Sequence, residues 1–516
     1  MSPNRRIVLN IVATYGRSLY ALVIGLFCGR WTLMALGDVD YGLIGVVGGL
    51  TAFVTFLNSI MAGGVGRFYA ISVGESQKNS NEGIEKCHEW FTTAVVVHTF
   101  LPLLLMCVGY PIGDWAVRHF LTIPPERVSQ CVWVWRFTCI SCFVSMISVP
   151  YNAMYGAKQE IAELTIYSFI TSTLNVLFLY YAVTHPGVWL VKYSAWSCLL
   201  SVVPSLIISL RSVLKYKECR FNKVYLRCWS NVKRMLSYSG WLIIGGMGDL
   251  LSAQGMSVLV NKYFGPRMNA AQNVGNTLSG QCSTLSGSML GAFWPAIMNA
   301  YGAGDIVRVR KLAYQVCKFA PLLIMLFAIP LSLEINEVLL LWLKNPPKYA
   351  AGLCVLALIV LVGDRSTHGF AIAMHATGKI AKYQAVVGGV YLFALPLAWL
   401  FFAFGMSVYA LGYAMIISRG ACAFMRMVMA RYQTGLSVRH WFFRIGIPLI
   451  VIASITISVG LLPRFVMPPS FIRIVVTTVV CSGSMGVLSW MLMVERQEKK
   501  YLVDKAVLFS RRFLMK

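Results

Sequence analysis

Long apolar runs separated by short polar stretches extend from one end of the chain to the other. Each run is about twenty residues or longer, the length that an α-helix needs to cross a bilayer. The pattern predicts about fourteen membrane-crossing helices, at 7–35, 41–73, 89–112, 129–155, 160–183, 187–210, 235–262, 268–300, 312–333, 350–378, 382–404, 406–430, 442–462 and 471–494. We therefore expect an all-α polytopic membrane protein.

One pair of these runs is related by an internal repeat. A shift of 228 residues, without a gap, lays 37–74 on 265–302 with seven identities in 38 positions. The matched glycines include Gly74 and Gly302. Because transporters are often built from two similar halves, the repeat favours two related lobes.

The runs also predict how the chain is divided. We expect an N-terminal lobe at 1–212 with helices 1 to 6, a basic cytoplasmic loop at 213–234 and a C-terminal lobe at 235–432 with helices 7 to 12. Helices 13 and 14 follow at 433–494, and a basic amphipathic tail at 495–516. The tail is typical of a helix lying on the inner leaflet, with docking to a partner as the alternative.

Composition agrees with this class and fixes an orientation. The chain is 58% hydrophobic and 12% charged, whereas a soluble protein carries about twice that charged fraction. The net charge of +26 therefore reports topology, and we expect no nucleic-acid partner. With the N-terminus inside, inner loops and ends hold 28 Lys and Arg against 8 outside. This asymmetry predicts an inner-membrane protein with both termini in the cytoplasm.

Sequence motifs for enzymatic chemistry are missing. We find no P-loop, no G-x-S-x-G, no paired-carboxylate hydrolase pattern and no zinc-type cluster. The fourteen cysteines are scattered, and the C-x-x-C of Cys139 and Cys142 lies within an apolar run, where packing is the better interpretation. We expect a transporter and not an enzyme, with no metal and no cofactor, and with H+ or Na+ as candidate coupling ions.

Ionisable residues inside the runs are the candidate functional groups, because each costs about 2.5–3.5 kcal/mol on insertion. Arg17, Arg365 and Arg419 lie deep in their runs, and Arg67 and Arg136 lie at intermediate depth. Such an excess of arginine over acid predicts an electropositive cavity for an anion, and a guanidinium matches phosphate oxygens bidentately. The alternatives are structural pairing and, for Arg136 beside two tryptophans, interfacial anchoring.

Four other cations lie nearer to the ends of the runs. We expect these side chains to extend to the interface: Arg30, Lys192, Lys318 and Arg426.

Helix 1 carries one small and polar face. Asn10, Thr14, Arg17, Ala21 and Gly25 follow one another at helical spacing, while the remaining positions are bulky. The face favours cavity lining, with packing on a neighbouring helix as the alternative.

The two acids within the runs are candidates for ion coupling. Asp364, His368 and His375 are spaced i, i+4 and i+11, which would place them roughly on one face of the run 350–378. Together they could relay protons or bind a coupling cation. Alternatively, Asp364 accepts from His368 or offsets a nearby arginine, and Asp249 has the same two interpretations.

The N-terminal part of the chain resembles a known family. Asn10 and Arg17 are followed by L-G-x-x-x-Y-G at 36–42 and F-L-N-x-x-M at 56–61. These features resemble Wzx-type O-antigen flippases of the multidrug/oligosaccharidyl-lipid/polysaccharide exporter superfamily. The motifs are confined to about the first 76 residues, and the architecture matches along the whole chain.

The resemblance implies a fold, a substrate and a mechanism. The expected fold is two six-helix lobes in a MATE-like V, with two extra C-terminal helices. The expected activity is alternating access through a cationic cavity for a polyprenyl-diphosphate-linked oligosaccharide, in the synthesis of a cell-surface polysaccharide such as lipopolysaccharide O-antigen. By position, Arg17 resembles a cavity arginine, and Asp249 lies where related exporters can carry a coupling acid. Membrane lipids and other polysaccharide-assembly proteins are the expected partners.

Two other functions were weighed against this one. A MATE-like multidrug or cation antiporter should hold its cationic substrates with acids and aromatic residues, and only two acids lie within the runs. A membrane-embedded glycan polymerase or ligase should carry charged residues in large outer loops. The longest outer loops here are about sixteen residues, at 113–128 and 334–349.

Overall fold

Helices are the regular structure throughout the part of the chain that the computed structural model describes. That part is 52–76, 80–121, 123–222, 224–225, 229–343 and 346–495, with scattered positions between 16 and 47. Every element in these ranges is a helix, so the all-α prediction is confirmed.

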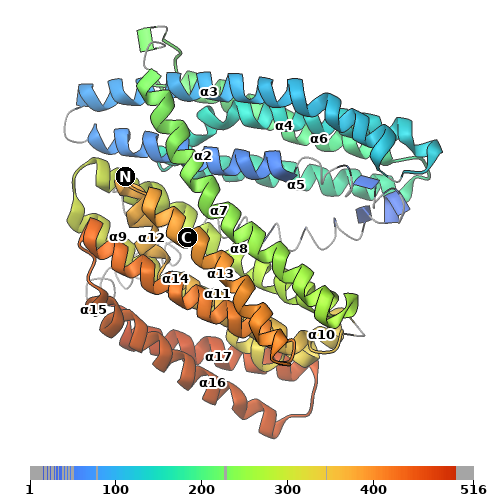
Figure 1. The fold of residues 1–516 in the computed structure, drawn as a ribbon, viewed down its shortest axis with the longest axis vertical. Helices are drawn as coiled ribbons and strands as arrows, with labels where there is room; N and C mark the ends of the chain where they lie inside the picture. Colours follow the sequence, from blue (N-terminus) through green and yellow to red (C-terminus); the bar gives the residue numbers. More distant parts are fainter. Residues whose placement is uncertain are drawn as a thin grey trace, which may run out of the picture. The chain divides into compact units, whose positions relative to one another are not determined.

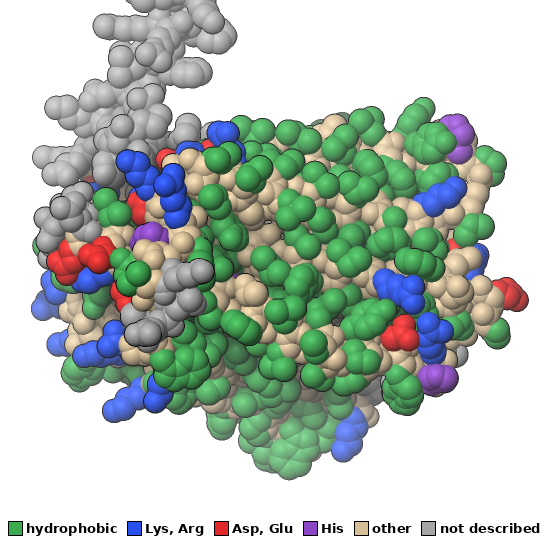
Figure 2. Space-filling model, turned by 90° about the horizontal axis from the view of Figure 1, so that it is seen from above, with side chains coloured by type: hydrophobic (Ala, Val, Ile, Leu, Met, Phe, Trp, Pro, Cys, Tyr) green, Lys and Arg blue, Asp and Glu red, His purple; other side chains and the backbone are tan. Residues whose placement is uncertain are grey.

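Ten described helices are long and apolar enough to cross a membrane. The number is eleven if the bent pair α11 (Ala350–Ser366) and α12 (His368–Thr377) forms one span. Figure 2 shows one face of the molecule with hydrophobic side chains over its middle and charged side chains gathered toward its ends. The protein is therefore a multi-pass membrane protein. The count of fourteen is not confirmed, since most of the first predicted helix lies outside the described residues.

Contacts divide the chain into two compact units. Unit 1 is 1–244, 288–309 and 376–381, and unit 2 is 245–287, 310–375 and 382–516. These units do not test the predicted lobes at 1–212 and 235–432, which stay a prediction.

Unit 1 is built around α4, which packs against α2, α3 and α6 (Figure 1). Its helices are α2 (Ala52–Glu75), α3 (Ser80–Trp115), α4 (Val128–Ala157), α5 (Ile161–Thr184), α6 (Leu190–Lys215), the start of α7 (Trp229–Phe264) and the end of α8 (Pro266–Gly302). The buried ring of Trp135 lies at the centre, where a Cβ at Gly113 would stand 2.0 Å from it. Glycine in α3 thus makes room for a large aromatic of α4.

Unit 2 packs its helices through small residues. Besides the remaining parts of α7 and α8 it contains α9 (Ile306–Leu333, from Arg310), α10 (Ile335–Leu343), α11, α12, α13 (Ala381–Ala403), α14 (Ala410–Thr434), α15 (Val438–Trp441), the π-helical turn Phe442–Gly446, α16 (Ile447–Val466) and α17 (Phe471–Leu492). A Cβ at Gly248 of α7 would lie 2.5 Å from the Cα of Gly388 in α13. Small residues let membrane helices approach this closely and gain dispersion contacts.

One buried ion pair fastens α17 to the rest of unit 2. The Glu334 side chain is fully buried, and Arg473 of α17 donates to its Oε2 from Nε at 3.1 Å and from Nη2 at 2.8 Å. Thr477 donates to Oε1 at 3.1 Å. Both carboxylate oxygens thus have hydrogen-bond donors, Arg473 at Oε2 and Thr477 at Oε1, which compensates the buried charge.

The internal repeat is visible in the backbone. Gly37 has φ +74° and Gly265 has φ +81°, a conformation that side chains other than glycine rarely adopt. Downstream, α2 ends at Glu75 and α8 ends at Gly302, one residue short of the repeat-equivalent position. The two copies therefore share their left-handed glycine and their helix end, which supports the repeat.

Candidate functional site

A buried arginine of α14 lies at the centre of a charged cluster in unit 2. Arg426 is 2% exposed. It donates to the Asp364 carboxylate at 3.1 Å, to the Asp364 carbonyl at 3.2 Å and to the Thr367 hydroxyl at 3.1 Å, and it reaches the Tyr391 hydroxyl at 3.4 Å. The expectation that this side chain extends to the interface is wrong, because an acid and two hydroxyls meet it inside the unit.

Arg365 extends the cluster toward α8. Its Nη2 donates to the Ser283 hydroxyl at 2.8 Å, and its Nη1 lies 3.8 Å from the Asp364 carboxylate. Its Nε is buried and makes no hydrogen bond among the described residues. The negative charge of Asp364 thus lies beside two arginines. This agrees with the structural interpretation of Asp364, in which the acid offsets a nearby arginine.

Arg419 forms the other half of the cluster. Its guanidinium forms an ion pair with Asp249 of α7 and lies 3.8 Å from the centre of the Tyr391 ring. The Asp249 side chain is 52% exposed, and that of Arg419 is 19% exposed. Unlike the pair of Arg426 and Asp364, this pair therefore opens to the surface of the unit.

The run 350–378, which carries Asp364, His368 and His375, is bent. α11 ends at Ser366 and α12 begins at His368, with a bend of 44°. The two histidines therefore lie on α12 and the acid on α11, and the shared face of the three stays a prediction. His368 keeps a buried Nδ1 without a hydrogen bond among the described residues, and its coupling role stays a prediction.

Arg67 of α2 belongs to unit 1. It is 6% exposed and donates to the carbonyl of Ala376, in the last turn of α12, at 3.0 Å. Its guanidinium also lies 4.7 Å from the centre of the Tyr238 ring. A cation at the carboxyl end of a helix complements the unpaired carbonyls there. Contacts of this kind indicate a structural role for Arg67.

The remaining predicted arginines are Arg136 and Arg17. Arg136 of α4 stacks on the Trp133 ring at 4.8 Å, and Trp133 is exposed, which favours interfacial anchoring. Arg17 lies outside the described residues, so its cavity role stays a prediction.

The cluster of unit 2 is close to neutral. It contains three arginines, at 365, 419 and 426, and two aspartates, at 249 and 364, which leaves one excess positive charge. No three His, Cys, Asp or Glu side chains gather as metal ligands would, within the part of the chain that the structure describes. The arrangement is suited to holding a small anion by exchange with a carboxylate.

Sequence reasoning missed four members of this cluster: Ser283, Thr367, Tyr391 and Arg426. An acid within a membrane run needs a partner, so Asp249 and Asp364 signalled that polar or basic residues lie near them. The partners of the two acids lie 62 and 170 residues away, however, so no local spacing identifies them.

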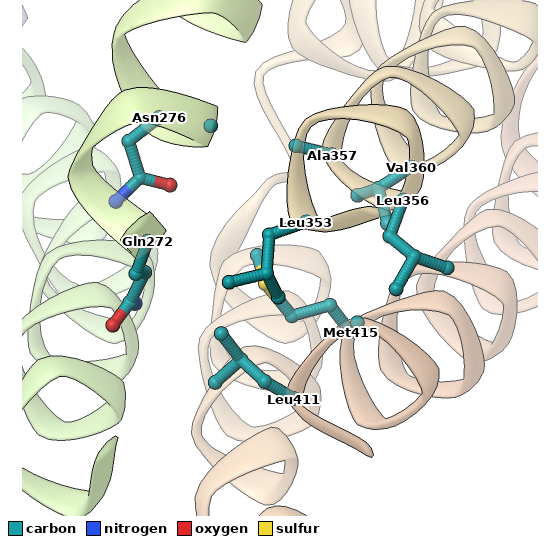
Figure 3. Close-up of a pocket in the computed structure, with 10 residues that line it drawn as sticks. Gln272, Asn276, Leu353, Leu356, Ala357, Val360, Leu411 and Met415 are labelled. Carbon is teal, nitrogen blue, oxygen red and sulfur yellow. The ribbon is translucent and has the colours of Figure 1, made fainter. Parts of the chain in front are cut away.

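A small pocket lies beside the cluster's helices in unit 2. Figure 3 shows Gln272 and Asn276 of α8 on one side and apolar side chains of α11 and α14 on the other, including Leu353 and Met415. The walls lack charged side chains, so the pocket offers no second anion site.

Comparisons with known proteins agree with this architecture. The family profile described as polysaccharide biosynthesis protein matches residues 32–301. No curated protein sequence matches the chain.

Solved structures of transporters share the fold. A MATE protein in complex with MaL6 is 15% identical, with 84% of this chain and 97% of that chain covered and a TM-score of 0.66. A MOP superfamily transporter from Pyrococcus furiosus, whose reversed binding-pocket polarity suggests a different function, is 14% identical over 84% and 96% with a TM-score of 0.65. An outward-facing multidrug resistance MATE transporter is 14% identical over 84% and 96%, with a TM-score of 0.64.

Proposed function

Because the chain belongs to the polysaccharide biosynthesis protein family, whose members are membrane transporters and not enzymes, we propose that it flips a polyprenyl-diphosphate-linked oligosaccharide. The flipping takes place across the bacterial inner membrane, with both chain termini in the cytoplasm, and supplies cell-surface polysaccharide synthesis. Alternating access exposes the site to each side in turn.

The observation that carries the proposal is the pair of Arg419 and Asp249. The guanidinium is stacked on Tyr391 and so is held in one orientation, while its carboxylate partner is half exposed. A diphosphate carries more charge than a carboxylate and offers the oxygens that a guanidinium fork matches. Substrate therefore displaces Asp249 from Arg419, and Asp249 returns when substrate leaves.

The same pairing argues against transport of cationic drugs. A site for cations needs an acid that is available to the substrate. Here Asp249 is paired with Arg419, and Asp364 is paired with Arg426 and Arg365. Both acids of the cluster are thus offset by arginine, which leaves the antiporter as the second candidate.

A gradient of H+, Na+ or substrate supplies the driving force in this scheme. Asp249 is the acid that substrate releases, so it is the candidate carrier of the coupling ion. The protein with Asp249→Asn should then transport with an altered dependence on pH or Na+. An unchanged dependence on both would remove Asp249 from coupling.

A binding measurement tests the substrate class. Purified protein in detergent is titrated with a short-chain polyprenyl diphosphate, the matching monophosphate and a lipophilic cation. We expect the diphosphate to bind most tightly, and Arg419→Ala to weaken it about tenfold or more, the loss of one charge-assisted contact of about 1.5–3 kcal/mol. Preferential binding of the cation would support the antiporter instead.

A further inference from the structure

The two repeat helices meet each other, and they meet through equivalent residues. A Cβ at Gly74 of α2 would lie 1.9 Å from the carbonyl oxygen of Asn299 in α8. A Cβ at Gly302 of α8 would lie 2.0 Å from the carbonyl oxygen of Ile71 in α2. The shift of 228 residues lays Gly74 on Gly302 and Ile71 on Asn299. The contact is therefore self-complementary, as at a two-fold axis between identical subunits.

Polar bonds accompany this crossing. Asn299 donates from Nδ2 to the carbonyl of Ala157 at 3.1 Å, and Arg67 donates to the carbonyl of Ala376 at 3.0 Å. Both bonds join a residue of the predicted N-terminal lobe to one of the predicted C-terminal lobe, and all four residues belong to unit 1. Gly378 leaves room for the Arg67 side chain, because a Cβ at position 378 would lie only 2.4 Å from Nη2 of Arg67.

The bounds of unit 1 show which segments of the predicted C-terminal lobe pack with the N-terminal helices. Three of its segments cluster with unit 1: 235–244, 288–309 and 376–381. They adjoin the loops 211–234, 303–305 and 378–380, all of which the basic residues place in the cytoplasm. The segments of the C-terminal lobe thus join unit 1 only at ends that are predicted to face inward.

We propose that this contact is a cytoplasmic latch, which must part before substrate is admitted from the cytoplasm. The proposal rests on the proposed function, since only an alternating-access transporter needs such an opening. Glycines form the crossing, so the two backbones touch without interlocking side chains and can separate without rotamer changes. The acceptors of the two polar bonds are backbone carbonyl oxygens. Water can donate to these oxygens once the latch is open. Arg67 is in this scheme a positioning residue and not a substrate ligand.

A reversible cross-link tests the latch. A Cβ at Gly64 of α2 would lie 2.8 Å from the hydroxyl oxygen of Ser239 in α7, so cysteines at these two positions would bring their side chains close enough for a disulfide. We expect the doubly substituted protein, Gly64→Cys with Ser239→Cys, to lose translocation of a fluorescent polyprenyl-diphosphate glycan on oxidation and to regain it on reduction. Each single cysteine substitution is the control for native thiols. Undiminished translocation by the oxidised protein would overturn the proposal, because it would show a permanent contact.

A second measurement separates the latch from the choice of substrate. Spin labels at the exposed positions Leu214 and Val307 report the separation of the predicted cytoplasmic ends without any substrate. We expect Gly74→Ala and Gly302→Ala to lengthen that distance, since each added methyl collides with a backbone carbonyl. The matched controls are Gly63→Ala and Gly291→Ala, the repeat-equivalent pair where a Cβ meets nothing within 4 Å.

These readouts distinguish the possible failures. One outcome is that the spin-label distance lengthens in Gly74→Ala and Gly302→Ala while the unmodified protein translocates no glycan. That outcome would retain the latch and reject the proposed substrate. Equal distances in the latch and control variants would reject the latch whatever the substrate.

Discussion

Replacing Arg426 by methionine should cost the protein much of its stability. The change removes the charge that faces Asp364 and the hydrogen bonds that the guanidinium makes to Asp364, Thr367 and Tyr391. Breaking one partner of a buried pair costs roughly 3–5 kcal/mol, because the other charge is left uncompensated. Arg365 still lies 3.8 Å from Asp364, so we expect the lower end, about 3 kcal/mol, or about a hundredfold in the folding equilibrium.

A double-mutant cycle measures this directly. Unfolding is followed by tryptophan fluorescence in mixed micelles of increasing SDS fraction, for Arg426→Met, Asp364→Asn and the double variant. We expect the double variant to recover most of the loss, since the acid that loses Arg426 is then neutral and only the longer 3.8 Å pairing of Asp364 with Arg365 is given up. Arg136→Met is the control for removing a cation from a membrane helix. Its stacking on Trp133 should contribute about 1 kcal/mol or less.

Two results would refute this reasoning. One is an Arg426→Met protein whose unfolding is within about 0.5 kcal/mol of the unchanged protein, inside the ordinary range of an uncoupled substitution. The other is a double variant whose loss equals the sum of the two single losses, which would mean that Asp364 and Arg426 contribute independently.

Three further predictions concern other parts of the chain. Arg473→Met should loosen α17, because it leaves Glu334 buried without the guanidinium that donates twice to its Oε2. Limited proteolysis between α16 and α17 should then become faster, while the control Arg464→Met changes little. A cysteine at the exposed Val224 should react with an impermeant maleimide only from the cytoplasmic side. The native Cys219 should stay silent, since it is 1% exposed and burial raises its pKa to about 12, so that little thiolate forms near neutral pH. Arg17→Ala should abolish flipping with normal protein abundance, and Arg17→Lys should retain part of the activity, in a cell-surface glycan assay.

The apolar pattern predicted the helices well because each membrane span must satisfy its own backbone hydrogen bonds. Length and hydropathy therefore identify a span without knowledge of its neighbours. The run 350–378 is bent at Thr367, without a proline or a glycine at the break itself. Thr367 accepts a hydrogen bond from Arg426 there, a tertiary contact that local sequence does not reveal.

The charged cluster was predicted only in part for a related reason. Depth within a run marked Arg365 and Arg419 as residues that need a polar partner, and each lies beside an aspartate. It also led to the expectation that Arg426 extends to the interface, because a position along one helix says nothing about an acid on another. Pairing of Arg426 with Asp364 depends on how α11 and α14 pack, and the sequence alone does not specify that packing.

Translocation of substrate tests the central claim most directly. Purified protein is reconstituted in vesicles that carry a fluorescent polyprenyl-diphosphate oligosaccharide, and the fraction reached by an external quencher is followed with time. We expect the unchanged protein to move the lipid between leaflets, and Arg419→Ala to be strongly impaired while its folding is retained. The polyprenyl monophosphate analogue should move more slowly. No movement above that of protein-free vesicles, across H+, Na+ and substrate gradients, would contradict the assignment of this chain as a flippase for diphosphate-linked glycans.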